Sequence, residues 1–151
     1  MSVGIGYDSH RFAEGRRLVL GGVEIEHELG LAGHSDADVL THAVIDALLG
    51  AAGGGDIGTL FPDDDERWRD ADSIDLLRTA VGTIAGRIVN VDATVVCELP
   101  RLEGSKAEME RVLSEATSAR VSVKATTNEG MGWIGRGEGI ACIAVAFVDS
   151  E

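Results

Sequence analysis

The chain has 151 residues, of which 44% are apolar, and it carries a formal net charge of −13. A chain of this length fits a single domain over residues 1–151, and an acidic excess of this size repels nucleic acids and anionic membranes, so neither is an expected partner. No apolar stretch approaches the roughly 20 residues of a membrane span and the N-terminus lacks the basic start of a signal peptide, so we expect a cytoplasmic protein.

Short strands followed by one long helix are predicted for the first third of the chain. Alternating side chains and a glycine turn predict strands at residues 3–7, 18–20 and 23–25. Asp36 or Asp38 then caps a helix that runs to about residue 52, where three consecutive glycines end it.

The remainder of the chain mixes helices and strands without strict alternation. Apolar spacing predicts helices at residues 73–85 and 105–117, and β-branched runs predict strands at residues 89–99 and 121–126. A glycine-rich loop precedes a long apolar strand at residues 140–148, which we expect to be buried on both faces. This order favours the α+β class, with one sheet covered by helices on one face.

Two cysteines, Cys97 and Cys142, lie within apolar and β-branched runs, where cysteine usually behaves as a small buried hydrophobe. They form no CxxC pair, and a disulfide framework is not indicated.

A candidate metal site combines one strand with the first helix. Asp8 and His10 are two residues apart on a predicted strand, so both side chains project from the same face. His42 falls outside the apolar arc of the predicted helix and is therefore not expected in the core. Two imidazole nitrogens and one carboxylate are a common catalytic zinc set with one open position. The alternatives are a hydrogen-bonded polar pair at a strand end and a solvated helix face with an incidental imidazole.

Two further segments are candidates for binding a phosphorylated ligand. His34-Ser35-Asp36 precedes the first helix, where free backbone N–H groups favour an anion; ordinary capping with a surface His34 is the alternative. The glycine-rich residues 53–58, followed by Phe61-Pro62-Asp63, let the backbone approach a ligand and offer Asp56 to accept hydrogen bonds from hydroxyls. A simple connecting loop is the alternative there.

The last third of the chain adds polar groups at the end of a strand. Thr126, Thr127 and Glu129 form a mix that suits phosphate oxygens and a hard divalent ion. Arg136 lies between glycines and is followed by Glu138; from these residues alone, a turn with a solvated Arg136–Glu138 pair is the preferred interpretation.

Taken in chain order, these motifs resemble the 2-C-methyl-D-erythritol 2,4-cyclodiphosphate synthase family over nearly the whole chain. The resemblance is carried by Gly6-Tyr7-Asp8-Ser9-His10, His34-Ser35-Asp36-Ala37-Asp38, His42, Gly55-Asp56-Ile57-Gly58, Phe61-Pro62-Asp63, Ala71-Asp72-Ser73, Lys124-Ala125-Thr126-Thr127 and Gly135-Arg136-Gly137-Glu138-Gly139. It implies a homotrimer with an active site at each subunit interface, on a mixed-sheet α+β fold similar to that of the trimeric chorismate mutases. It also implies zinc on Asp8, His10 and His42.

The same resemblance implies the reaction and the roles of other residues. The substrate would be 4-diphosphocytidyl-2-C-methyl-D-erythritol 2-phosphate, whose 2-phosphate attacks the diphosphate and releases CMP. Magnesium or manganese would act with the substrate, anchored by Glu129, and His34 and Thr127 would also take part in catalysis. The residues implied to bind substrate are His34, Ser35, Asp56, Ile57, Gly58, Asp63, Pro100, Arg101, Thr126, Thr127, Trp133 and Arg136.

The resemblance further implies an apolar cavity on the threefold axis that takes an isoprenyl diphosphate. The chain departs from the family pattern near that axis, because Tyr7 and Trp133 stand where phenylalanine is common. In the cytidine-binding segment, Pro100-Arg101 stands where Pro-Lys is usual.

Two other functions stay open. A metal-dependent phosphoesterase would use the same three ligands with a bound water as nucleophile and would release inorganic phosphate. A trimeric metal-binding or ligand-sensing module would have the fold without turnover. A pure scaffold needs neither Glu129 nor Asp56, which favours an enzyme.

Overall fold

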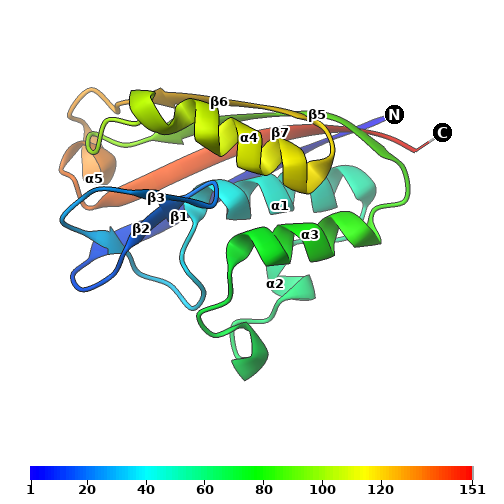
Figure 1. Ribbon diagram of the computed structural model, residues 1–151, viewed down its shortest axis with the longest axis horizontal. Coiled ribbons are helices and arrows are strands. Elements are labelled where there is room, and N and C mark those ends of the chain that lie inside the picture. Colours follow the sequence, from blue (N-terminus) through cyan, green and yellow to red (C-terminus); the bar gives the residue numbers. More distant parts are fainter. Residues whose placement is uncertain (151) are drawn as a thin grey trace.

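The computed structural model describes residues 1–150 and contains a mixed β-sheet (Figure 1). The strands of this sheet are β1 (Ser2–Ala13), β4 (Gly30–Leu31), β5 (Arg87–Val96), β6 (Arg120–Thr126) and β7 (Gly139–Asp149), and a separate hairpin consists of β2 (Leu18–Leu20) and β3 (Val23–Ile25). Within the described residues the order is β4-β1-β7-β5-β6. β5 and β6 are parallel, whereas the other neighbours are antiparallel.

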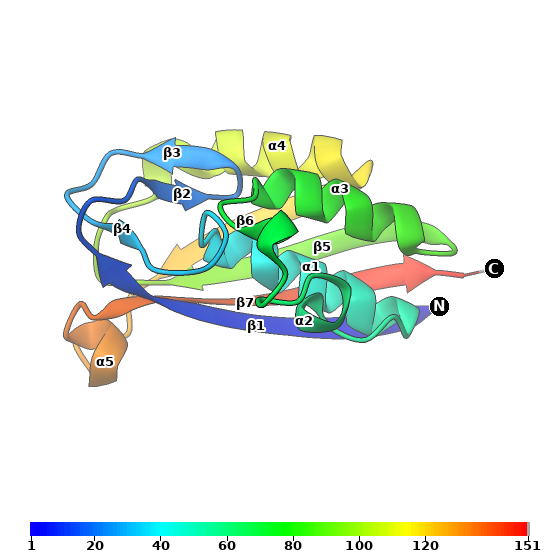
Figure 2. The same cartoon turned by 90° about the horizontal axis from the view of Figure 1, so that it is seen from below.

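The long helices α1 (Val39–Ala52), α3 (Ser73–Thr83) and α4 (Lys106–Thr117) cover one face of this sheet (Figure 2). The short helix α2 (Ile57–Leu60) follows α1, and α5 (Gly132–Gly135) lies at one end of the sheet. Two 3₁₀ turns are η1 (Glu66–Trp68) and η2 (Glu103–Ser105). α1 packs on β1 and β7, α4 packs on β6, and α3 lies against α1 and α4. The predicted α+β class, with a mixed sheet and helices on one face, is therefore confirmed. None of the helices in residues 1–150 has both the length and the apolarity to cross a membrane.

Local signals define the two ends of α1. The Asp38 carboxylate accepts a hydrogen bond from the Thr41 N–H, with 2.9 Å between N and Oδ1, and so caps the first turn. At the other end Gly53 adopts a left-handed φ of 70°, and its N–H donates to the Gly50 carbonyl. The predicted helix is confirmed, and its cap is Asp38 rather than Asp36.

Several short elements fall outside the predicted pattern. β1 continues from the predicted residues 3–7 to Ala13, and α2 and α5 interrupt segments predicted as loops. β4 lies in a segment for which no element is predicted. β4 has two residues, and α2 and α5 have four each. Such elements contain too few residues for a repeat of 2 or 3.6 to become visible in the sequence.

The expectation that β7 is buried on both faces is wrong for the chain by itself. Ala144 is fully buried beneath α1, whereas Ile143 and Val145 are 43% and 40% exposed. They pair across the sheet with Tyr7 and Ile5 of β1, so large apolar side chains share the outer face. The sequence is apolar on both faces of β7, but helices of this chain cover only one of them (Figure 2).

Two glycines in β1 let α1 lie directly on the sheet. A Cβ atom added at Gly4 would collide with the Ala47 carbonyl, and one added at Gly6 would collide with the Ala43 carbonyl. Nearly every residue of α1 is buried, including His42. A helix buried all round packs on several sides at once, here on the sheet and on α3. Gly4 and Gly6 thereby set the distance between β1 and α1.

Replacing Gly6 by alanine is expected to destabilise the protein. The new methyl group would meet the backbone of α1, and overpacking of this kind typically costs about 1–3 kcal/mol. The free energy of unfolding, measured in urea at one protein concentration, checks this expectation.

Gly82→Ala is the matched control. Gly82 lies within α3, an added Cβ would meet no atom within 4 Å, and alanine is favoured over glycine in a helix by roughly 0.5–1 kcal/mol. We expect this variant to be as stable as wild type or more stable. Equal stability of Gly6→Ala and wild type would show that Gly6 does not set the spacing.

Candidate functional site

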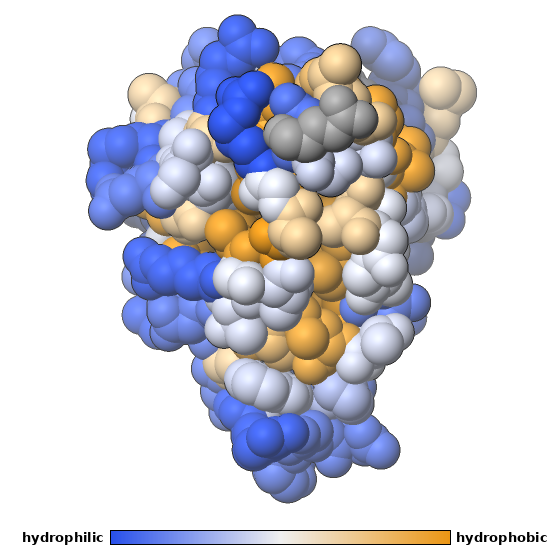
Figure 3. All heavy atoms as spheres, turned by 90° about the vertical axis from the view of Figure 1, so that its right-hand side faces the viewer, coloured by the Kyte–Doolittle hydropathy of each residue, from blue (hydrophilic) through white to orange (hydrophobic). Residues whose placement is uncertain are grey.

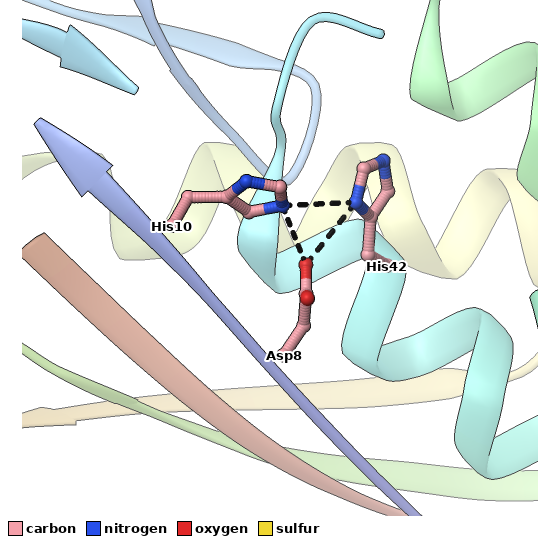
Figure 4. A group of neighbouring side chains, drawn as sticks. All are labelled: Asp8, His10 and His42. Carbon is pink, nitrogen blue, oxygen red and sulfur yellow. Dashed lines mark hydrogen bonds and ion pairs between the residues drawn. The ribbon is translucent and has the colours of Figure 1, made fainter. Parts of the chain in front are cut away.

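Asp8, His10 and His42 converge where β1 meets α1 (Figure 4). Asp8 Oδ2 lies 2.8 Å from His10 Nε2 and 3.1 Å from His42 Nδ1, and the two nitrogens are 3.4 Å apart. Because side chains alternate along a strand, Asp8 and His10 project from the same face of β1 as Gly6. The three side chains that the sequence groups together are therefore neighbours in the structure.

His42 lies in a buried polar region rather than on a solvated helix face. It is only 9% exposed, and Asp38, four residues earlier, is fully buried. The Asp38 carboxylate accepts hydrogen bonds from the N–H groups of Gly21 and Gly22, both at 2.8 Å, and from Thr41. The expectation that His42 lies outside the core is wrong, because Ser35, before α1, and Ser73, at the start of α3, lie within hydrogen-bond distance of its ring and help to bury it.

A hydrogen bond fixes how His10 faces the cluster. His10 Nδ1 lies 2.7 Å from the Ala32 carbonyl oxygen, which can only accept a hydrogen bond. In the neutral imidazole, Nδ1 therefore carries the proton and the Nε2 lone pair points toward Asp8 and His42. Histidines that bind metals commonly donate from their far nitrogen to a carbonyl in this way.

The cluster shifts the pKa values of two of its members. Burial raises the pKa of Asp8, but the hydrogen bonds and positive charges of His10 and His42 outweigh burial and lower it to about 2. Burial lowers the pKa of His10, but the hydrogen bond and negative charge of Asp8 outweigh burial and raise it. The carboxylate and the imidazole thus stabilise each other's charged forms.

The donor set and its spacing fit a zinc ion. Tetrahedral zinc with bonds of about 2.0–2.1 Å places its ligand atoms roughly 3.3 Å apart. The three separations here, 2.8, 3.1 and 3.4 Å, lie close to that value. The triad lines a cavity of about 240 Å³, so a fourth position would open toward a ligand.

The same cavity gathers several of the residues that the sequence assigns to substrate binding. It is lined by Asp8, His10, Gly33, His34, Ser35, His42, Ile57, Gly58, Phe61, Asp63, Trp68 and Leu76. Among the described residues, Asp56 is not part of this lining, because its carboxylate caps α2 by accepting hydrogen bonds from the N–H and hydroxyl of Thr59.

Trp68 is a lining residue that the sequence does not single out. Its ring packs edge-on against Phe61, with centroids 5.0 Å apart, and Arg67 lies over its other side, 5.3 Å from the centroid. Its buried indole N–H has no hydrogen-bond partner within residues 1–150. Only the folded arrangement of the 61–68 segment brings this ring to the cavity.

A second cavity, of about 660 Å³, gathers other predicted groups. Pro100, Arg101, Thr126 and Thr127 line it, where the end of β6 meets the segment after β5. In the described chain the linings of the two cavities share no residue. Within residues 1–150 none of these four residues lines the cavity of the metal triad.

Glu98 organises the turn beside this second cavity, although no sequence motif marks it. Its Oε1 accepts hydrogen bonds from the N–H groups of Asn128, at 2.9 Å, and Gly130, at 3.2 Å. Glu129 lies between them, exposed, with a left-handed φ of 55°. Glu98 therefore holds the turn that presents the Glu129 carboxylate.

The glycine-rich loop before β7 contains the Arg136–Glu138 ion pair that the sequence predicts. Arg136 Nε lies 2.6 Å from Glu138 Oε2, and both side chains are more than half exposed.

Trp133, in α5, lines a third cavity of about 690 Å³ together with His10 and Phe12.

The sequence matches the YgbB family over residues 1–149. The chain belongs to this family. Curated relatives include the 2-C-methyl-D-erythritol 2,4-cyclodiphosphate synthases of Rubrobacter xylanophilus, 57% identical, and Salinibacter ruber, 54% identical. These matches cover 97% and 99% of this chain and 94% and 99% of the relatives. The family resemblance of the sequence motifs is confirmed.

Solved structures agree with the YgbB assignment. The bifunctional IspDF of Campylobacter jejuni matches with a TM-score of 0.91 at 42% identity, over 96% of this chain. This chain spans 41% of the length of that bifunctional protein. A 2C-methyl-D-erythritol-2,4-cyclodiphosphate synthase in its CDP-bound form matches with a TM-score of 0.87 at 35% identity, over 97% of this chain and 99% of that one.

Both cysteines of this YgbB family member are buried free thiols, as expected. Burial raises the pKa of the Cys97 thiol to about 11 and raises the pKa of the Cys142 thiol further. A buried thiol with a raised pKa is a poor nucleophile. The chemistry of the site therefore falls to the triad and its neighbours.

The stability of the metal-free protein is expected to depend on pH through Asp8. Folding lowers the Asp8 pKa from 3.8 to about 2, so its contribution to stability is present above pH 3.8 and is lost as the pH falls toward about 2. That shift corresponds to about 2 kcal/mol. Over this pH range, urea unfolding should show a loss for chelator-treated wild type that exceeds the loss for Asp8→Asn by this amount. Parallel profiles would contradict the ion pairing described for the cluster.

Proposed function

We propose that this chain converts 4-diphosphocytidyl-2-C-methyl-D-erythritol 2-phosphate to 2-C-methyl-D-erythritol 2,4-cyclodiphosphate and CMP, a step of non-mevalonate isoprenoid biosynthesis. The observation that carries the proposal is the convergence of Asp8, His10 and His42 at a cavity that also holds His34 and Ser35. Curated relatives that match the chain nearly end to end are named for this activity.

The reaction is an intramolecular phosphoryl transfer. An oxygen of the 2-phosphate bonds to the phosphorus attached to the methylerythritol, the bond from that phosphorus to the bridging oxygen breaks, and CMP leaves with that oxygen. A phosphate oxygen is already anionic, so no side-chain base has to remove a proton. Holding both reacting groups in one oriented molecule supplies at best roughly 7–11 kcal/mol of the barrier.

The triad would hold a zinc ion through Asp8 Oδ2, His10 Nε2 and His42 Nδ1. When bound, zinc supplies a Lewis acid that offsets phosphate charge and orients the substrate. His34 and Ser35, in the same cavity, would position the 2-phosphate.

Residues around α2 would bind the erythritol hydroxyls. Ile57, Gly58 and Asp63 line the triad cavity, so their backbone and carboxylate groups are within its reach. Asp56 is exposed at the start of α2 and would accept hydrogen bonds from a hydroxyl there.

The nucleotide half of the substrate would bind in the second cavity. Pro100 and Arg101 would contact cytosine, and the hydroxyls of Thr126 and Thr127 would donate to the diphosphate. The structures described as CDP-bound and as a CDP complex support a nucleotide site on this fold. Because the two cavities of one chain share no lining residue among residues 1–150, the substrate would reach from one subunit's triad to the second cavity of its neighbour.

Glu129 would anchor magnesium or manganese on the diphosphate. Its carboxylate is exposed, and Glu98 holds the turn that carries it. Oxygen donors suit these hard ions, which take most of their remaining ligands from phosphate and water. The second ion would offset the charge that gathers on the diphosphate.

A homotrimer would cover the outer face of the sheet. Exposed apolar side chains gather there, namely Val3, Ile5, Tyr7, Ile143 and Val145. Tyr7 pairs with Ile143 and Ile5 pairs with Val145, so these side chains form one patch. Figure 3 shows a further apolar band, bordered by hydrophilic side chains, at the end of the molecule that carries both termini. Contiguous apolar patches of this kind mark interfaces.

The threefold axis would offer a place for an isoprenyl diphosphate. Trp133 and Arg136 would lie near that axis, where the Arg136 guanidinium would meet the diphosphate. Among residues 1–150 the Arg136 side chain makes an exposed ion pair with Glu138, which a diphosphate would readily replace.

The products of the reaction separate cyclisation from hydrolysis. With magnesium or manganese present, phosphorus NMR of the wild-type reaction should report CMP and a cyclic diphosphate. Glu129→Gln should lose at least about tenfold in turnover while it keeps its zinc, because only the second ion and its charge are removed.

Metal analysis provides the control for this experiment. His42→Ala should lose most of its zinc, whereas Glu129→Gln should retain it. Release of inorganic phosphate by wild type would instead indicate a phosphoesterase, and the absence of turnover in a zinc-loaded trimer would indicate a non-enzymatic module.

The mass in solution tests the trimer. Light scattering should give three chains for wild type and a smaller particle for Ile5→Lys, because a charge would then face the apolar patch. Ala107→Lys, on the exposed side of α4, is the control and should keep the wild-type mass. A wild-type monomer that turns over substrate at micromolar concentration would refute the shared site.

A further inference from the structure

The second ring nitrogen of His42 points away from Asp8 and His10 (Figure 4). Two buried hydroxyls lie beside it. His42 Nδ1 points to Asp8, whereas Nε2 lies 2.8 Å from Ser73 Oγ and 3.1 Å from Ser35 Oγ. Without a metal, the Asp8 carboxylate can only accept and so favours a proton on Nδ1. A hydroxyl can donate or accept, so the opposing preference at Nε2 depends on how the two hydroxyls are oriented.

Asp36 orients the Ser73 hydroxyl. The Asp36 carboxylate makes a short contact with Ser73 Oγ and also accepts hydrogen bonds from the N–H groups of Ser73, at 3.0 Å, and Asp38, at 3.1 Å. A carboxylate only accepts, so the Ser73 hydroxyl proton is used on Asp36. The remaining lone pairs of Ser73 Oγ are then left to accept a hydrogen bond from the Nε2–H of His42.

Helix capping does not explain these contacts of the Ser73 hydroxyl. The cap of α3 is Asp72, which accepts from the Ile74 N–H, and the cap of α1 is Asp38. Ser73 is fully buried and His42 nearly so, so water does not compete for the hydrogen bond. The contacts therefore join three separate segments, the 34–38 turn, α1 and α3, at the back of one imidazole.

We propose that Asp36 and Ser73 are positioning residues that favour the Nε2–H tautomer of His42 and so free the Nδ1 lone pair for the metal. This inference rests on the proposed zinc site for its function, but the tautomer itself is a property of the chain. Partners that orient a histidine ligand from behind typically change metal affinity by 10–100-fold when they are lost.

Nitrogen NMR of the metal-free protein reads the tautomer directly. Spectra are recorded at about pH 9, well above the ordinary imidazole pKa of about 6.5. The Asp8 carboxylate, 3.1 Å from Nδ1, favours a proton on that nitrogen, so metal-free wild-type His42 should populate both tautomers, with Nε2–H a substantial share. Ser73→Ala removes the acceptor, and Asp36→Asn lets an amide donate to Ser73 Oγ and reverse that hydroxyl, so in both variants the Nδ1–H form should gain population.

Zinc affinity, measured by chelator competition, is the second readout. Ser73→Ala and Asp36→Asn should each raise the zinc dissociation constant about tenfold or more. Thr41→Val is the matched control, because it also removes a buried hydroxyl that donates to a carboxylate, at 2.8 Å from Asp38 Oδ2, but not one that meets His42. Its zinc affinity should stay within about twofold of wild type.

The two measurements fail independently. A wild type that binds no zinc would defeat the proposed metal site, and the tautomer of the metal-free protein would still decide the role of Asp36 and Ser73. An unchanged His42 tautomer in both variants overturns the inference. Zinc affinity in Ser73→Ala equal to that of Thr41→Val overturns it as well.

Discussion

The close approach of α1 to β1 is the constraint on which the site depends. Gly6 leaves its face of the strand bare, and the carbonyl of Ala43 occupies the space that a side chain would fill. The next residue on that face is Asp8, and the residue before Ala43 is His42. The backbone contact that glycine permits therefore brings the carboxylate and the imidazole together, and His10 completes the set two residues further along. A zinc ion bound by these three side chains would require no movement of β1 or α1.

The turn that leads into α1 distributes its side chains among different partners. His34 lines the triad cavity, and the Ser35 hydroxyl and the Asp36–Ser73 pair lie on the side of His42 that faces away from the triad. Ala37 is buried with a left-handed φ of 57°. Asp38 binds the β2–β3 turn to the start of α1. Burial raises the pKa of Asp38, and the N–H groups that it binds oppose that effect. Asp38 and Asp36 thus have different roles. Asp38 fixes the packing of the β2–β3 hairpin on α1, and Asp36 orients the proposed metal ligand His42 through Ser73.

Sequence periodicity predicts site features that depend on a single strand or helix. It does not predict features that depend on contacts between distant segments. The alternation of β1 places Asp8 and His10 on one face, and a helical repeat sets His42 apart from its apolar neighbours. The Asp36–Ser73 contact joins residues 37 positions apart, and the Glu98 contact with Asn128 joins residues 30 apart, so neither leaves a local pattern. The burial expected for β7 was misjudged for a related reason, since an apolar face predicts a cover without saying which chain provides it.

The two faces of β1 connect the site to the proposed interface. Even-numbered residues of the strand face α1 and end in Asp8 and His10, whereas Ile5 and Tyr7 face outward beside β7. Tyr7 is bonded through the backbone to Asp8, so subunits that pack on Tyr7 would also fix the strand that carries the carboxylate. The neighbour would supply the second cavity as well, since the threonines at the end of β6 do not line the cavity of their own triad. Association would then complete the substrate site and restrain the metal ligands through one strand, and it would account for the apolar residues on both faces of the sheet.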